Sequence, residues 1–292
     1  MKRRGFILAA LGIVAPAPLL AAGGRFSRGV LWRISRDSVA PSHVFGTIHV
    51  ADPRLGELAG PVQQAFAESS SMMVEYFADA YGRERFLEAA MYLDRQTLQD
   101  TIGREDFERA LELLAPIGLS REFVNKLKPW GVLINLRHPR GAGGASLDAL
   151  LFELARRRRL SLDMMENVEE QVFTFDEFPI DSQIALLRHS LVHHRELLEL
   201  SGRTVEAYLA RDLAAIWKLQ EDYSRRHPEM TPHNAVFLKR VIFDRSVVMA
   251  FRMQRGLRRG RAFVALGALH LFGEKGVLAL LENDGYRAER VF

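Results

Sequence analysis

The sequence predicts an α/β protein in which a mixed central sheet is flanked by helices and carries a large helical insertion. Short apolar runs with strand character alternate with helical patterns near both ends of the chain. The middle of the chain, about residues 81–159 and 179–256, is helical in pattern almost throughout. The same motif, Gly-x-x-His, closes two strand-like runs that are far apart in the sequence, at Gly46–His49 and Gly267–His270.

The composition is that of an ordinary globular protein and excludes several kinds of site. The 292 residues are 48% hydrophobic and 26% charged, which is enough for a sizeable core. The net charge is +4, but residues 1–23 hold three basic and no acidic side chains, so nothing in the charge indicates a nucleic acid partner. The absence of cysteine excludes disulfides, thiolate ligands, a cysteine nucleophile and lipoprotein attachment. A site must therefore use His, Asp, Glu and Arg.

Residues 1–23 have the layout of a secretory signal peptide. A basic start precedes an apolar centre over residues 6–20, and small residues follow, with cleavage expected near Ala22 or Gly23. The centre contains two prolines and is shorter than the roughly 20 residues of a spanning helix, so we expect no stable membrane span after cleavage. An uncleaved anchor is the alternative. The paired arginines near the start also fit a twin-arginine signal, and Sec export is the other route to a periplasmic or secreted location.

The first elements after the leader are expected to be a hairpin and then a crossover. Leu31–Ser35 and His43–Val50 have the pattern of two strands joined by a polar turn. Residues 55–68 have helical spacing, and the next strand ends at Glu75. A strand, a helix and a strand of this length favour a right-handed parallel crossover, which brings both carboxyl ends to one edge of the sheet. We therefore expect His49 and Glu75 to lie side by side.

The rest of the chain is expected to complete a single domain over residues 24–292. A strand near residues 160–166 ends at Glu166, another covers Arg261–His270, and a last one lies near residues 287–292. The helices that capping signals and apolar spacing predict cover residues 83–93, 104–114, 121–127, 130–136, 146–158, 179–225, 234–256 and 274–282.

Four side chains at predicted strand ends supply two imidazoles and two carboxylates: His49, Glu75, Glu166 and His270. Two histidines and one carboxylate form a common catalytic arrangement for a divalent metal such as zinc, cobalt, manganese or iron. The metal activates a water, and the carboxylate that is not a ligand can take its proton. The spacing does not distinguish Glu75 from Glu166 in these roles. The alternative is that these side chains only cap loops or bind backbone groups.

Arg245 is a further candidate, on the helix before the second histidine motif. A guanidinium there could stabilise a developing oxyanion or bind a substrate carboxylate. The alternative is a solvated side chain, or one paired with Asp244 or Asp181.

A second possible metal motif is His189-x-x-x-His193, because two histidines four residues apart share one face of a helix and Glu196 follows one turn later. The glutamate of the His-Glu-x-x-His protease signature is absent. The apolar stripe of this helix lies elsewhere, so we expect both imidazoles to face solvent. We also expect His227 and His233, in proline-containing loop sequence, to contact solvent.

Several stretches carry a resemblance to a known family. They are Val44–Val50 with Asp52-Pro53, Met73–Glu75, Lys128–Trp130, Met165-Glu166 with Glu169–Gln171, Arg245 with Met249-Ala250, and Val264–Leu271 with Gly273 and Gly285-Tyr286. In these motifs, from about Leu31 to the C-terminus, the chain resembles the TraB/GumN family, which is grouped with pheromone-shutdown proteins and related to the Tiki metalloproteases.

The resemblance implies an erythromycin-esterase/ChaN-like α/β fold and a metal-dependent hydrolase, with proteolysis the activity of the Tiki relatives. Many bacterial members have an asparagine where this chain has Ser246, so a shorter hydroxyl replaces an amide that could bind metal or substrate. The residues that the resemblance supports are His49, Glu75 and His270 as the metal site, with Glu166 and Arg245 around it.

The sequence thus favours an exported metal-dependent hydrolase, and within that class a peptidase that uses a metal-activated water. Manganese, cobalt and zinc are the candidate metals, and a peptide or small molecule is the expected substrate. One alternative is a non-catalytic periplasmic binding protein for haem, metal or peptide on the same fold. Another is a metal-independent esterase with His49 or His270 as general base. No glycine-rich phosphate loop or Gly-x-Ser-x-Gly turn is present in the right context, so nucleotide binding and serine hydrolysis lose support.

Overall fold

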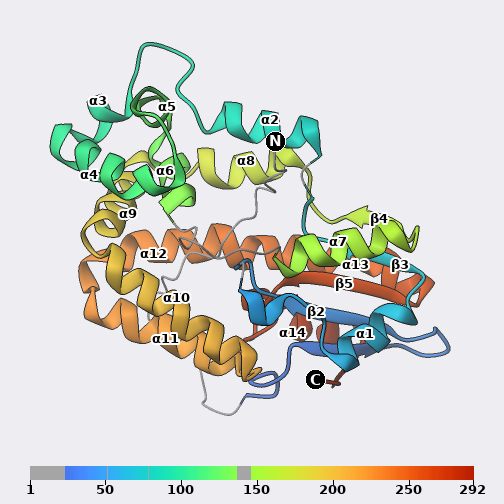
Figure 1. The fold of residues 1–292 in the computed structure, drawn as a ribbon. Coiled ribbons are helices and arrows are strands. Elements are labelled where there is room, and N and C mark those ends of the chain that lie inside the picture. Colours follow the sequence, from blue (N-terminus) through green and yellow to red (C-terminus); the bar gives the residue numbers. More distant parts are fainter. Residues whose placement is uncertain (1–23, 51, 78, 137–145) are drawn as a thin grey trace.

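A computed structural model describes residues 24–292 apart from residues 51, 78 and 137–145. The expected signal peptide and the glycine loop at 141–144 lie outside the described residues. In the described part, one mixed sheet has the strand order β4-β3-β5-β2-β1-β6, surrounded by helices (Figure 1). The predicted mixed α/β class is confirmed. The more specific erythromycin-esterase/ChaN-like fold stays a prediction.

The sheet joins an antiparallel edge to a parallel centre. The predicted hairpin is confirmed, because β1 pairs antiparallel with β2, and β6 pairs with the other side of β1. The antiparallel side of the sheet consists of β1 (Leu31–Ser35) and the edge strand β6 (Arg287–Arg290). The strands that run parallel are β2 (Ser42–Thr47), β5 (Ala262–Gly267), β3 (Ser71–Val74) and β4 (Ser161–Met164).

The two strands joined by the predicted crossover run parallel, as expected, but they are not neighbours in the sheet. The 3₁₀ turn η1 (Pro53–Leu55) and the helix α1 (Gly60–Ala67) lead from β2 to β3. These two strands run parallel, yet β5 lies between them. Every residue of β5 is buried, as expected for a central parallel strand that is covered on both faces. The carboxyl end of β5 therefore separates the ends of β2 and β3.

Helices cover both faces of the sheet (Figure 1). On one face, Phe263 of β5 packs edge-on against Phe66 of α1, with ring centroids 5.3 Å apart. On the other face, Gly256 of α13 (Arg245–Arg259) lies against the side chains of β3 and β5. The last helix, α14 (Val277–Asn283), packs beside α13 and β6. A helix layer on each face keeps water from the apolar central strands.

The middle of the chain is helical, as predicted, and forms two blocks. The block before β4 contains α2 (Ala80–Ala89), α3 (Leu98–Ile102), α4 (Arg104–Leu114), η2 (Ala115–Ile117), α5 (Arg121–Lys126), α6 (Pro129–Leu136) and α7 (Leu147–Arg157). The block after β4 contains α8 (Val168–Asp176), α9 (Ile180–Val192), α10 (His194–Leu209), α11 (Leu213–Arg226), η3 (Pro228–Met230), α12 (Thr231–Phe237), a π-helical segment (Leu238–Asp244) and α13. The short helices α3 and α8 are absent from the sequence prediction.

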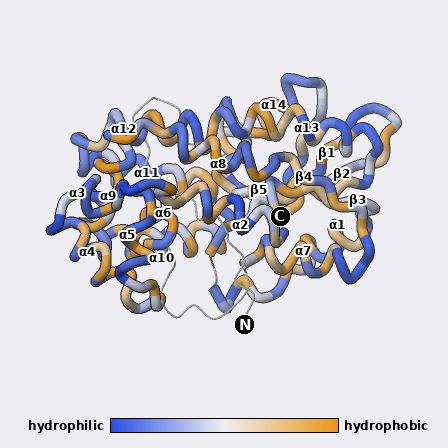
Figure 2. The backbone as a smooth tube through the Cα atoms, turned by 90° about the horizontal axis from the view of Figure 1, so that it is seen from above, coloured by the Kyte–Doolittle hydropathy of each residue, from blue (hydrophilic) through white to orange (hydrophobic). Residues whose placement is uncertain are grey.

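The predicted helical region at residues 179–225 is three helices, because the chain turns twice. His193 separates α9 from α10, and Arg211, with a φ of 57°, ends α10 before α11. Figure 2 shows hydrophobic and hydrophilic stretches alternating along these helices, the pattern of helices with a buried face. No helix in the described ranges is both long and apolar enough to cross a membrane.

Candidate functional site

The two Gly-x-x-His motifs leave the same edge of the sheet. β2 and β5 are neighbouring parallel strands with Thr47 opposite Gly267, which confirms the expected meeting of the motifs. Beyond β2, the chain to His49 has no regular structure, whereas Ala268–His270 form a 3₁₀ turn. The motifs share a spacing in sequence but not a backbone conformation, so the two imidazoles occupy non-equivalent positions.

Each motif glycine makes room for the site. A Cβ at Gly46 would lie 2.6 Å from Cδ1 of Leu271, just after the second motif. A Cβ at Gly267 would lie 3.2 Å from Nε2 of His49 and 3.3 Å from Oε1 of Glu75. The φ of Gly267 is −56°, so the position requires glycine for space rather than for its backbone conformation. His49 and Glu75 thus come together across the end of β5.

His49 is oriented by Asp148, which the sequence analysis did not single out. Its Nδ1 lies 2.8 Å from Oδ2 of Asp148, and Oγ1 of Thr47 donates to Oδ1 at 2.7 Å. Because an ionised carboxylate only accepts, Nδ1 donates its hydrogen to Asp148, and Nε2 is the ring nitrogen that a metal would have to bind after losing its proton. Burial disfavours the charged ring, but Asp148 and Glu75 outweigh it and raise the pKa of His49 to about 9. The available signal was the Ser146 cap, which places Asp148 in the first turn of α7.

His270 is oriented by Ser246, the residue that replaces the expected asparagine. Oγ of Ser246 donates to the carbonyl of Ile242 at 2.7 Å and lies 2.9 Å from Nδ1 of His270. A hydroxyl has one hydrogen, so Ser246 accepts from Nδ1–H, and Nε2 of His270 is left free. Burial, only partly offset by Glu75, lowers the pKa of His270 to about 4. The ring is therefore neutral, which is the form that binds metals.

Glu75 and Glu166 converge on Arg245. Nη2 of Arg245 lies 2.7 Å from Oε2 of each glutamate, and Nε lies 2.8 Å from Oε1 of Glu166. All three side chains are buried. The π-helical segment ends just before Arg245, and such segments are frequent at functional sites. Arg245 is thus neither solvated nor paired with Asp244, and its guanidinium fixes both carboxylates.

Glu75 is the carboxylate that faces the imidazoles. Its Oε1 accepts from the backbone N–H of Gly267 and lies 3.8 Å from Nε2 of His270. Glu166 is bound instead by Arg245 and by Nε2 of Gln171, at 2.6 Å. Burial raises the pKa of Glu75, but Arg245 and the two histidines outweigh this and lower it to about 2. The structure therefore distinguishes two glutamates that the sequence leaves equivalent.

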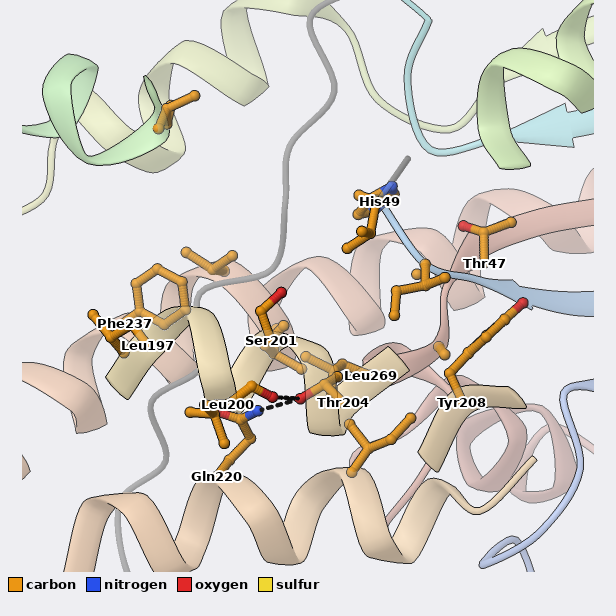
Figure 3. Close-up of a pocket in the computed structure, with 18 of the residues that line it drawn as sticks. Thr47, His49, Leu197, Leu200, Ser201, Thr204, Tyr208, Gln220, Phe237 and Leu269 are labelled. Atoms are coloured by element: carbon orange, nitrogen blue, oxygen red, sulfur yellow. Dashed lines mark hydrogen bonds between the residues drawn. The ribbon is translucent and has the colours of Figure 1, made fainter. Parts of the chain in front are cut away.

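A largely apolar cavity of about 120 Å³ adjoins the motif ends. Figure 3 shows His49 at one end of this cavity, and Leu197 of α10 and Phe237 of α12 at the other. The hydroxyl of Tyr208 donates to the carbonyl of Gly46 at 2.7 Å and ties α10 to the first motif. The polar groups of the motifs thus lie at one end of an apolar chamber.

The donors at the motif ends fit a divalent metal in kind, since Nε2 of neutral His270, Nε2 of His49 once a metal displaces its proton, and an ionised carboxylate face one place. These donor atoms lie farther from one another than the donor atoms around a bound metal ion do. A different group of residues is more compact. In the part of the chain that the structure describes, His189, His193 and His227 have donor atoms that all lie within 4.8 Å of one another. Metal binding at the motif ends therefore requires the donor atoms there to move closer together.

Comparison with known proteins agrees with the resemblance. Residues 30–290 match the model of the TraB/PrgY/gumN family. The chain belongs to this family. It is similar to Metalloprotease TIKI2 of Xenopus tropicalis, at 24% identity, and to Metalloprotease TIKI1 of Homo sapiens, at 25% identity, with 89% of this chain covered in each case. The matched parts are 59% and 61% of those relatives, so this family member spans about three fifths of their length. No solved structure matches it significantly.

In this TraB/PrgY/gumN protein, the expectation of solvent-facing histidines outside the motifs is wrong at His189, and His227 is only slightly exposed. His189 is 7% exposed, and the side chain of His227 is 12% exposed. His193 keeps one third of its side-chain surface, and His233 lies 2.9 Å from Oγ of Ser182. A single apolar stripe predicts one buried face, but α9 packs against α4, α6, α10 and α12. Helices on several sides of α9 therefore bury side chains, such as His189, that do not belong to its apolar stripe.

Proposed function

We propose that this protein is an exported metal-dependent hydrolase, and specifically a peptidase, that binds a divalent metal through His49, His270 and Glu75. The observation that carries the proposal is the convergence of Nε2 of His49 and Oε1 of Glu75 on Gly267, between two motifs on adjacent strands. Similarity to proteins named metalloproteases supports the same chemistry. Manganese, cobalt and zinc are the candidate metals, and the signal-peptide pattern supports a periplasmic or secreted location.

The bound metal supplies an activated water as nucleophile at neutral pH. The chain keeps both imidazoles in the ligating orientation. Asp148 accepts from Nδ1 of His49, and Ser246 accepts from Nδ1 of His270, so each ring presents Nε2. Outer partners of this kind fix the tautomer and the orientation of ligating histidines.

Glu75 combines two properties that the reaction needs. It is ionised because Arg245 and the histidines stabilise its charge, and its Oε1 faces His270. A carboxylate in this state can bind the metal or accept the proton of the attacking water. Glu166 touches Arg245 and Gln171, and we assign it the role of a positioning residue that holds the guanidinium against Glu75.

The cavity supports a substrate with an apolar group beside the scissile bond. Its lining combines the motif ends with apolar side chains of α10 and α12. An apolar chamber of this kind accommodates an aliphatic or aromatic side chain and excludes water from the reacting centre. A peptide with such a side chain satisfies this description.

Metal removal tests the proposal directly. We expect a chelator to abolish hydrolysis of apolar peptides by the chain from residue 24 onwards, and added manganese, cobalt or zinc to restore it. His49→Ala and His270→Ala are expected to remain folded and inactive, whereas His43→Ala, on β2 outside the site, keeps activity. Full hydrolysis in chelator would contradict the proposal. Tight capture of haem, metal or peptide without turnover, unchanged in Glu75→Gln, would establish the binding-protein alternative.

Asp148→Asn is expected to weaken metal binding at the motif ends by about 10–100-fold, the usual effect of removing an outer partner of a ligating histidine. The amide accepts less strongly from Nδ1 and carries no charge. Asp163→Asn is the matched control, since Asp163 is a surface aspartate paired with Arg259. Zinc affinity by competition with a chelating dye measures both variants, and equal affinities would remove Asp148 from the site.

The same pair of residues gives the metal-free protein a pH dependence. The pKa of His49 is about 9 in the folded protein, above its ordinary value of 6.5. Stabilisation by Asp148 is therefore fully present below about pH 6.5 and is lost as the pH rises through about 9. We expect the unfolding free energy to fall more between about pH 6 and pH 10 in the wild type than in Asp148→Asn. Urea titrations at both pH values measure this difference, and parallel losses would refute the linkage.

A further inference from the structure

Three histidines outside the Gly-x-x-His motifs form a compact cluster in the helical block. We propose that His189, His193 and His227 are a second divalent metal site, which binds zinc or a similar transition metal ion and clamps three helices together. The proposal goes beyond the hydrolase function and does not depend on it, because the two sites share no residue.

The three imidazoles lie at nearly equal distances from one another. The ring centroids are 4.5 Å apart for His189 and His193, 4.7 Å for His189 and His227, and 4.5 Å for His193 and His227. One nitrogen from each ring lies within 4.8 Å of the others. Zinc–nitrogen bonds of about 2.0–2.1 Å place tetrahedral donors about 3.3 Å apart. Side-chain rotation that brings the nitrogens up to about 1.5 Å closer completes the site.

His189 has the outer partner that ligating histidines need. Its Nε2 lies 2.7 Å from the hydroxyl of the buried Tyr223, which fixes the ring. The other ring nitrogen, Nδ1, lies 3.8 Å from Oε1 of Glu229. A buried ring held at one nitrogen and open at the other has the arrangement of a metal ligand.

Glu196 lies beside two of the three imidazoles and is the carboxylate that would become the fourth donor if the site closed around a metal. Its Oε2 lies 3.2 Å from Nε2 of His227 and 3.6 Å from Nδ1 of His193. Its Oε1 is bound by Arg226 at 3.0 Å, which holds the carboxylate in place. Glu229 approaches His227 from the other side, at 3.6 Å. Two carboxylates beside three imidazoles provide the negative charge that a divalent cation requires.

The types of donor in the cluster indicate which metals fit it. Nitrogen donors with one carboxylate suit zinc, cobalt, nickel or copper rather than magnesium or calcium.

The position of the cluster gives the metal a structural role and a route of entry. His189 belongs to α9, His193 separates α9 from α10, and His227 directly follows α11. A surface depression lined by Val192, His193, Arg195, Glu196 and Glu199 reaches the cluster. Because α10 and α11 also form one wall of the apolar cavity, a metal here fixes that wall.

The test uses a protein in which the motif site is already disabled. Zinc is titrated calorimetrically into the His49→Ala/His270→Ala variant after metal removal. We expect one zinc per chain, a rise in Tm of roughly 5 °C at saturating zinc, and the visible absorption of tetrahedral cobalt when cobalt is used instead. Adding His193→Ala and His227→Ala to this variant is expected to abolish all three signals.

Two control substitutions and one substitution in the wild-type protein complete the test. Adding His43→Ala and His233→Ala, two histidines outside both sites, is expected to leave all three signals unchanged. Absence of saturable zinc binding in the motif-disabled protein, or binding that persists without His193 and His227, overturns the proposal. If a combined variant is unfolded by circular dichroism, the partly exposed His193 is replaced alone in the wild type. The number of zinc ions per chain then falls by one, whether or not the motif site binds metal.

Discussion

Arg245→Met is expected to destabilise the protein by about 3–5 kcal/mol, the usual effect of removing one partner of a buried ion pair. The guanidinium bonds both Glu75 and Glu166 at 2.7 Å, and all three side chains are buried. Methionine fills a similar volume but leaves two carboxylates without their counter-charge. Urea denaturation near neutral pH, followed by circular dichroism, gives the free energy of unfolding.

Arg259→Met is the matched control, because Arg259 ends the same helix and pairs with Asp163 at the surface. An exposed pair of this kind contributes about 0–1 kcal/mol. If the loss in Arg245→Met arises from uncompensated charge, neutralising both partners with Glu75→Gln and Glu166→Gln restores part of the stability. A loss for Arg245→Met no larger than that for Arg259→Met would mean that the buried charges are not coupled as the geometry indicates.

Gly267→Ala is expected to lower hydrolytic activity by roughly 3–10-fold, since the catalytic groups must shift by a few tenths of an ångström and a misplacement of about 1 Å costs about 100-fold. The added methyl lies 3.2 Å from Nε2 of His49 and 3.3 Å from Oε1 of Glu75, in the space where these donors converge. Both groups must then move apart, whereas metal binding requires them to approach. The measurement is kcat/KM on an apolar peptide, together with bound metal per chain.

Gly202→Ala is the control for the same chemical change. Gly202 lies within α10, and a Cβ there meets no atom within 4 Å. Alanine in a helix interior is favoured over glycine by about 0.5–1 kcal/mol, so this variant should be fully active and slightly more stable. Unchanged activity and metal content in Gly267→Ala would show that the motif donors do not act together at this position.

Much of the sheet could be predicted because its central strands β3 and β5 are apolar runs and because most strands end at clear polar or glycine positions. The strands that end near Thr47, Val74, Met164 and Gly267 all follow from local pattern, and the two histidine motifs fall where strands leave the sheet. The order of the strands could not be predicted in the same way. β5 enters between β2 and β3 although it lies almost 190 residues beyond β3, and no local signal records a pairing at that distance.

Within the site, the sequence identifies the groups but not their roles. It indicates His49, His270 and two strand-end glutamates, while the role of Asp148 depends on where α7 packs after the sheet has formed. Only the folded structure separates the two glutamates, because Glu75 faces His270 and the N–H of Gly267, whereas Glu166 is bound by Arg245 and Gln171.

The sequence by itself determined the residue types available for chemistry, the strand ends that carry them and the family to which the chain belongs. Tertiary structure alone decided which of these groups meet, and it also brought His227 to His189 and His193 from a different helix. The physical reason is that apolar periodicity is a local property, whereas a site is made by side chains that packing brings together from distant segments. Burial and charge at the meeting point then set the protonation state of each group.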